Sequence, residues 1–163
     1  MKEAIGNAAL FYIIITFVVI MIMFFVGSLS YSKAFKVKNK IVEEIEKEGE
    51  VPGADPYTAY ARAEDAIYEW LQSGGENGTG IGYRQNTGGL NNHLSCNEGN
   101  AVNKGGDYQY CVYQIDTCAK GREGRCGVYY RVTAYMFFDI PIIGEMLKIP
   151  ISGETMIFTK LES

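Results

Sequence analysis

The chain begins with one uninterrupted apolar run. Residues 8–29 form a stretch of 22 residues, and no charged side chain occurs between Ile5 and Ser32. As a helix this run would rise roughly 33 Å, about the thickness of the hydrocarbon core of a bilayer. Because it is apolar on every side, it predicts a helix surrounded by lipid or by a bundle of identical helices. We place this helix at residues 8–30, after a short N-terminal segment, residues 1–7.

A cleaved secretory signal is the alternative interpretation of the same run. The apolar part of such a signal spans about 7–15 residues, which is shorter than this run, although the small residues at 27–30 are of the kind that a signal peptidase accepts. Tyr12 and Tyr31 lie near the two ends, where aromatic side chains favour the level of the lipid headgroups. These features favour an uncleaved span.

Beyond the run, the polar and apolar positions take on a helical period. Ala34, Ile41 and Ile45 recur at the spacings of one helix face, which predicts that the helix continues as a stalk over residues 31–49 and stops at Gly49. The lysines of this stalk come first and its glutamates last, an order that opposes the helix dipole. We therefore expect tertiary or intersubunit packing to compensate.

A second helix and a long loop follow. Asp55 supplies an N-cap, and Pro56 occupies the first helical position. The apolar stripe of this helix consists of Tyr60, Ala63, Ile67, Trp70 and Leu71. The stripe ends before the glycines at 74 and 75. Residues 74–106 hold ten of the 19 glycines and seven asparagines, a composition that predicts a loop.

From Asp107 onward the period becomes two. Apolar and polar positions alternate over residues 108–115 and 128–138, which predicts two long antiparallel strands. Residues 140–147 form an apolar excursion that we interpret as a short helix, and a last strand is expected at 151–161. The expected fold class is therefore α+β, with a long N-terminal helix, a second helix and a small antiparallel sheet. The head domain spans residues 50–163.

Charge and motifs exclude several classes of function. The net charge of -4 gives no basic face for a nucleic acid, and the single histidine, His93, has no ligand or catalytic partner at a suitable spacing. The sequence contains no nucleophile elbow, zinc-protease motif or phosphate-binding loop. The carboxylates on predicted helices are isolated: Glu64, Asp65, Glu69 and Glu145. We therefore predict no enzymatic activity, no cofactor and no metal.

Four cysteines, Cys96, Cys111, Cys118 and Cys126, lie in the C-terminal half. They allow three pairings. We favour Cys118–Cys126, which would close a polar hairpin tip, and consequently Cys96–Cys111, which would pin the glycine-rich loop. A zinc site would need Cys-x-x-Cys pairs, which are absent. Free cysteines in a cytosolic domain are the third option.

The lysines that follow the span and the four cysteines indicate opposite orientations of the chain in the membrane. The residues that follow the span closely include Lys33, Lys36, Lys38 and Lys40. By the positive-inside rule these lysines would place the C-terminal domain in the cytoplasm. Disulfides form in oxidising compartments, and long domains translocate despite flanking charge. We therefore expect a single-pass protein of the cell membrane with an extracytoplasmic C-terminal domain.

This layout resembles the type IV pilin superfamily and, within it, the TadE-like pilins of tight-adherence systems. The resemblance lies in residues 6–12, which open the apolar run, and in residues 130–141 and 151–158 on either side of an apolar bend. It implies a prepilin peptidase that cuts after Gly6, so that Asn7 becomes the new N-terminus. Phe11 then stands where the family has a glutamate that pairs with a neighbour's new amine. This departure favours a minor or divergent pilin, or an unprocessed membrane-anchored relative.

The resemblance implies a structural subunit of a surface filament or secretion-type apparatus. Its partners would be the membrane, copies of itself or related pilins, an assembly ATPase with its membrane platform, and the prepilin peptidase. Subunits would exchange lipid contacts for helix contacts in a filament core. The helix-packing residues would be Leu10, Ile14, Phe17, Met21 and Phe24. The alternative is a single-span, membrane-anchored extracellular binding or sensor module, whose glycine- and asparagine-rich loop contacts a ligand.

Overall fold

A computed structural model gives the fold of the chain. It describes residues 2–72, 81, 83, 96, 99–103, 108–117, 127–139 and 146–159. The elements in chain order are α1 (Lys2–Gly49), the 3-10 helix η1 (Pro56–Thr58), α2 (Ala59–Leu71), β1 (Tyr110–Asp116), β2 (Gly127–Asp139), β3 (Met146–Glu154) and β4 (Phe158–Thr159). The expected layout of a long apolar N-terminal helix, a second helix and a small antiparallel sheet is confirmed.

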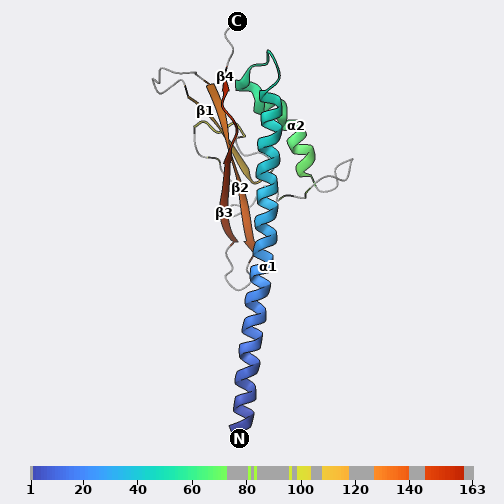
Figure 1. Cartoon of the computed structure of the whole chain (residues 1–163), viewed down its shortest axis with the longest axis vertical. Coiled ribbons are helices and arrows are strands. Elements are labelled where there is room, and N and C mark those ends of the chain that lie inside the picture. Colours follow the sequence, from blue (N-terminus) through green and yellow to red (C-terminus); the bar gives the residue numbers. More distant parts are fainter. Residues whose placement is uncertain are drawn as a thin grey trace.

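Helix α1 is one continuous rod. Its 48 residues rise roughly 72 Å. Figure 1 shows its N-terminal half standing clear of the rest of the fold, while its C-terminal half lies along the sheet. The helix ends at Gly49, as expected, where a Cβ would overlap the ring of Phe158. A larger residue at the end of α1 would therefore displace β4.

The segment expected as a stalk, residues 31–49, forms part of the core of the head. Ala34, Val37, Ile41 and Ile45 are at most 1% exposed. Their spacing of three and four residues places them on one face of α1, which contacts the sheet and α2. The packing unit therefore begins at about residue 34, inside the helix that also carries the apolar run.

The second helix follows the expected pattern with a different first turn. Asp55 accepts a hydrogen bond from the N–H of Tyr57 (3.2 Å) and so caps η1, which leads into α2. The members of the expected stripe are buried, except that Trp70 is only partly buried against the core. Helix α2 ends at Leu71, before the glycines that were expected to stop it.

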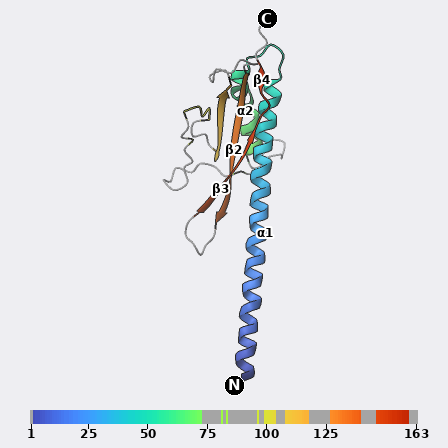
Figure 2. The same cartoon turned by 60° about the vertical axis from the view of Figure 1, so that its left-hand side comes forward.

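The sheet has the order β1-β2-β3, and all of its neighbours are antiparallel. The pairing of β1 with β2 confirms the two strands expected from the alternating pattern, with Tyr110 opposite Ala134 and Asp116 opposite Val128. Val128, Tyr130, Val132 and Ala134 occupy alternate positions of β2 and are all fully buried. Figures 1 and 2 show the helices on one side of the sheet, with α1 running along the strands.

Two expectations about the last part of the chain are wrong. Met146 and Leu147, expected in a short helix, begin β3, because they pair with Asp139 and Phe138 at the end of β2. The expected strand over residues 151–161 is interrupted at 155–157 before β4. Thr155 bridges the interruption, since its N–H donates to Tyr130 O (2.9 Å) and its Oγ1 accepts from Tyr130 N (3.0 Å).

Candidate functional site

The N-terminal half of α1 exposes an apolar surface of unusual extent. We call residues 9–30 the apolar arm. The large apolar side chains on every side of this helix segment are exposed, from 40% for Val19 to 77% for Phe24. By length and composition the helix that carries the arm is able to cross a membrane. Contiguous apolar surface of this size marks a membrane or protein contact rather than a surface that faces water.

The arm contains a polar hydroxyl that is satisfied within the helix. Thr16 Oγ1 donates to the carbonyl oxygen of Tyr12 at 2.8 Å. Because the bond is formed inside the helix, this hydroxyl needs no partner from solvent. The expected packing residues all lie exposed on the arm: Leu10, Ile14, Phe17, Met21 and Phe24. Their alternating spacing of four and three residues places them along one stripe.

Aromatic and basic side chains mark the point where the arm meets the head. The rings of Tyr31 and Phe35 stack with centroids 6.1 Å apart, and Lys38 Nζ lies 4.4 Å from the centroid of Phe35. Tyr31 is 52% and Phe35 41% exposed. Amphipathic rings and lysines of this kind favour the headgroup region of a bilayer. Gly6 and Asn7, the residues implied in processing, lie in the first turns of α1.

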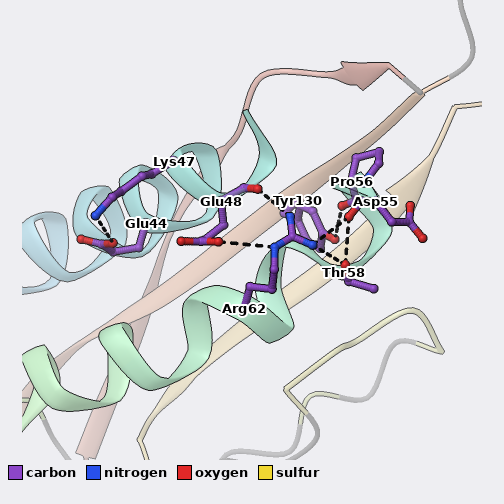
Figure 3. A network of polar contacts seen from close by, with 8 residues as sticks. All are labelled: Glu44, Lys47, Glu48, Asp55, Pro56, Thr58, Arg62 and Tyr130. Atoms are coloured by element: carbon purple, nitrogen blue, oxygen red, sulfur yellow. Dashed lines mark hydrogen bonds and ion pairs between the residues drawn. The ribbon is translucent and has the colours of Figure 1, made fainter. Parts of the chain in front are cut away.

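Tertiary contacts compensate the glutamates at the C-terminal end of α1, as expected from the order of lysines and glutamates along the helix. Arg62 of α2 reaches across to it, with Nε 3.3 Å from Glu48 Oε2 and Nη2 bonded to the Glu48 carbonyl oxygen at 2.5 Å. The same guanidinium donates from Nη1 to Asp55 O (3.1 Å) and to the hydroxyl of Thr58. Figure 3 shows this network joining the end of α1, the following turn and the start of α2. A cation at the C-terminus of a helix also interacts favourably with the helix dipole.

Three other glutamates of α1 also have partners. Glu46 Oε1 accepts from the N–H of Met156 at 2.9 Å, which ties the helix to the segment before β4. Lys40 Nζ lies 2.7 Å from Glu44 Oε1 and 3.2 Å from Glu43 Oε1. The hydrogen bond to Glu44 is the main reason that the pKa of Lys40 is raised. These glutamates therefore anchor the head to its helix or pair along it.

A disulfide joins Cys96 to Cys111 of β1, the pair favoured from the sequence, with their Cα atoms 5.7 Å apart. Oxidised in this way, neither sulfur is a thiolate able to bind zinc. Cys118 and Cys126 lie outside the described residues, as do His93, Glu145 and most of the glycine-rich segment. Asn103 also pins this part of the chain, because its side chain donates to Tyr110 O at 2.7 Å and accepts from Val112 N at 2.6 Å.

Tyr83 is a structural residue that the sequence reasoning missed. Its Oη lies 2.8 Å from both the N–H and the carbonyl oxygen of Tyr135, and 3.0 Å from Gln109 O. It therefore satisfies the backbone of β2 at the position just beyond the last pair with β1, Tyr110–Ala134. Burial raises the pKa of its phenol. The only available signal was an aromatic residue within a glycine-rich stretch.

The described carboxylates do not form a catalytic pair. Asp116 and Glu154 line a pocket of about 380 Å³, but Asp116 accepts from Tyr57 Oη (3.2 Å) and Glu154 pairs with Arg131 (3.0 Å). Glu64, Asp65 and Glu69 are exposed on α2. Among the described residues, no three His, Cys, Asp or Glu side chains are grouped to hold a metal.

The fold and the site together define an α+β head built on a helix whose other half is an exposed apolar arm. Comparisons with protein-family models, with curated proteins and with solved structures found no match. The features of the described residues that bear on function are therefore the exposed apolar arm and its junction with the head.

Proposed function

We propose that this protein is a single-pass, pilin-like structural subunit of a surface filament or secretion-type apparatus. In this proposal the apolar arm anchors the subunit in the cell membrane, holds the head outside the cytoplasm and later packs against the arms of other subunits. The observation that supports it is the exposure of apolar side chains on every side of the arm, in a helix that continues into the core of the head.

The composition of the arm is sufficient for stable anchoring. Its fourteen Leu, Ile, Val and Phe residues contribute roughly 0.3–0.6 kcal/mol each, which is about 4–8 kcal/mol in favour of insertion. A helix without a polar face is equally suited to lipid and to a bundle of identical helices. Transfer from membrane to filament therefore requires no refolding of the arm.

The cysteines support an extracytoplasmic orientation of the head. A disulfide at Cys96–Cys111 supports an oxidising compartment, and a long domain translocates despite the lysines that follow the arm. Phe11, at the position of the family's glutamate, supports a minor or divergent subunit, since an apolar side chain offers no carboxylate to a neighbour's amine. No cofactor enters this function.

Assembly through the arm is tested by two matched double variants. Ile14→Ala with Met21→Ala truncates the expected packing stripe, and Ile15→Ala with Ile22→Ala makes a similar change on another side of the same helix. At on the order of 1 kcal/mol per lost contact, the stripe variant should lower self-association in membranes roughly 30-fold. Crosslinking of membranes and the yield of sheared surface material measure this. Equal behaviour of the two variants would contradict packing through the stripe.

Cleavage of the N-terminus and the assignment as a pilin-like subunit are both tested on the native protein. Mass spectrometry distinguishes an N-terminus at Asn7 from an intact Met1. An intact N-terminus together with absence from sheared surface filaments would overturn the pilin-like assignment and favour a membrane-anchored binding or sensor module. Such a module would also tolerate both double variants without loss of ligand binding.

A further inference from the structure

The end of the β2–β3 hairpin reaches toward the apolar arm. Strand β3 passes beside residue 38 of α1, because an ideal Cβ at Gly153 would lie 2.8 Å from Lys38 Cδ. From Gly153 the strand runs back to Met146, opposite Asp139 at the end of β2. In Figures 1 and 2 this end of the hairpin points toward the N-terminal half of α1, and in Figure 2 it stands away from the helix.

The height of the hairpin end along α1 follows from the rise of the two elements. Seven residues of β3, from Gly153 to Met146, span roughly 23 Å at full extension, a distance that α1 covers in about 15 residues. With an allowance for the tilt of the strand, Met146 lies level with about residues 23–27, which belong to the arm. By the same measure Pro150 lies level with about residue 31, the position of Tyr31.

The described side chains of the hairpin become more exposed toward this end. Ala134 of β2 is fully buried and Met136 is 8% exposed, whereas Ile149, which pairs with Met136, is 37% exposed. Within the described residues, the last four residues of β2 pair with β3 only. A two-stranded apolar ribbon is marginally stable in water and needs a surface to pack on.

The charges near the junction fit a bilayer surface as that packing partner. Lys33, Lys36 and Lys38 of α1 follow the arm, with Tyr31 and Phe35 exposed on the same stretch. Aromatic side chains, and lysines that extend to the interface, are typical of the headgroup level. The hairpin crosses that level at about Pro150, so Ile149 lies at the lipid surface, and Lys148 is close enough to extend its ammonium back to the headgroups.

We propose that the end of the β2–β3 hairpin is a second membrane contact, resting in the headgroup and upper acyl region of a phospholipid bilayer beside the arm. This inference rests on the proposed single-span placement of the arm. Two contacts fix the tilt of the head over the membrane, whereas one helix alone leaves the head free to rotate and tilt. A subunit that leaves the bilayer must then release the hairpin together with the arm.

Tryptophan quenching by brominated lipids tests the depth of the hairpin. The full chain is placed in nanodiscs at one copy per disc, so that no neighbouring arm contacts the hairpin. Trp70→Phe removes the native fluorophore, and single tryptophans are introduced as Ile149→Trp, Met156→Trp or Phe17→Trp. Met156 is 48% exposed and bonded to Glu46, far along α1 from the arm.

The expected result has three parts. Phe17→Trp loses fluorescence to bromines deep in the acyl chains, Ile149→Trp loses it mainly to bromines near the headgroups, and Met156→Trp is unaffected. Quenching of Phe17→Trp with no more quenching of Ile149→Trp than of Met156→Trp overturns the hairpin contact alone. An unquenched Phe17→Trp contradicts the span itself, and with it the proposed function. Pro150→Trp, at a neighbouring exposed position, repeats the measurement if Ile149→Trp fails to fold.

Discussion

Replacement of Arg62 by alanine should destabilise the head, because this one side chain connects three segments. Its guanidinium donates to the carbonyl oxygens of Glu48 and Asp55 and to the hydroxyl of Thr58, and it pairs with the Glu48 carboxylate. The change therefore removes the polar contacts by which Arg62 joins the end of α1 to the start of α2. It also removes a cation that pairs with Glu48 near the C-terminus of α1.

The expected cost is about 2–3 kcal/mol of unfolding free energy. Hydrogen bonds to a charged donor contribute roughly 1.5–3 kcal/mol each when water is excluded. The Arg62 side chain is 30% exposed and Asp55 is exposed, so water replaces part of each lost bond, and we count about 1 kcal/mol for each carbonyl. The partly exposed ion pair with Glu48 adds less than about 1 kcal/mol.

The assay is urea unfolding of the full chain in detergent micelles, followed by the fluorescence of Trp70. This residue lies on α2, so its signal reports the head, whereas the arm can stay helical in detergent. Arg62→Lys is the matched control, since it keeps the charge but loses the planar fork, and it should cost about half as much. A free energy for Arg62→Ala within about 0.5 kcal/mol of the wild type would refute the bridging role.

Three further changes separate the contributions to stability. Ile41→Ala should lower the free energy of unfolding by about 2–5 kcal/mol in the same assay. Ile14→Ala on the arm should leave the stability of the head unchanged. Equal effects would contradict the division of α1 into an exposed arm and a part buried in the head. Tyr83→Phe should cost about 1–3 kcal/mol. Because burial raises the pKa of Tyr83, the wild type should also lose stability as the pH rises above 10, the ordinary tyrosine value, and Tyr83→Phe should reduce that loss. Cys96→Ser with Cys111→Ser should lower the free energy of unfolding by about 3 kcal/mol, and an unchanged urea midpoint would argue against the bridge as a constraint on the chain.

The sequence predicts the parts of the fold that have a clear period. The helical spacing of Ile41 and Ile45 and the alternation along β2 each have a period set by local geometry, and both are found as expected. The apolar run has no period but is identified by its length, and it too is found in a helix. The helix expected at residues 146–147 is wrong, because a short apolar run with no period fits a buried helix as well as a strand. Their state is decided by pairing with Asp139 and Phe138 of β2, which no local pattern records.

The contacts that connect distant segments were less accessible from the sequence. The glutamates at the end of α1 indicated that a compensating partner was needed, but not that Arg62 would supply it from α2. Tyr83 carries no periodic signal at all, because its role depends on where β1 stops pairing with β2. The sequence shows that the glutamates need a partner, and it shows that Tyr83 is present. Only the tertiary fold brings Arg62 to Glu48 and Tyr83 to the end of the β1–β2 pairing.

The continuity of α1 has a mechanical consequence for the proposed subunit. The helix that carries the exposed arm also supplies Ala34, Val37, Ile41 and Ile45 to the core, without a proline or a break between the two halves. A force on the arm is therefore transmitted to the centre of the head rather than to a flexible linker. The bonds from Arg62 and to Glu46 hold the far end of the same helix, so axial sliding of α1 would break both at once. The arm and the head should therefore move as one rigid unit when the subunit exchanges lipid for neighbouring helices.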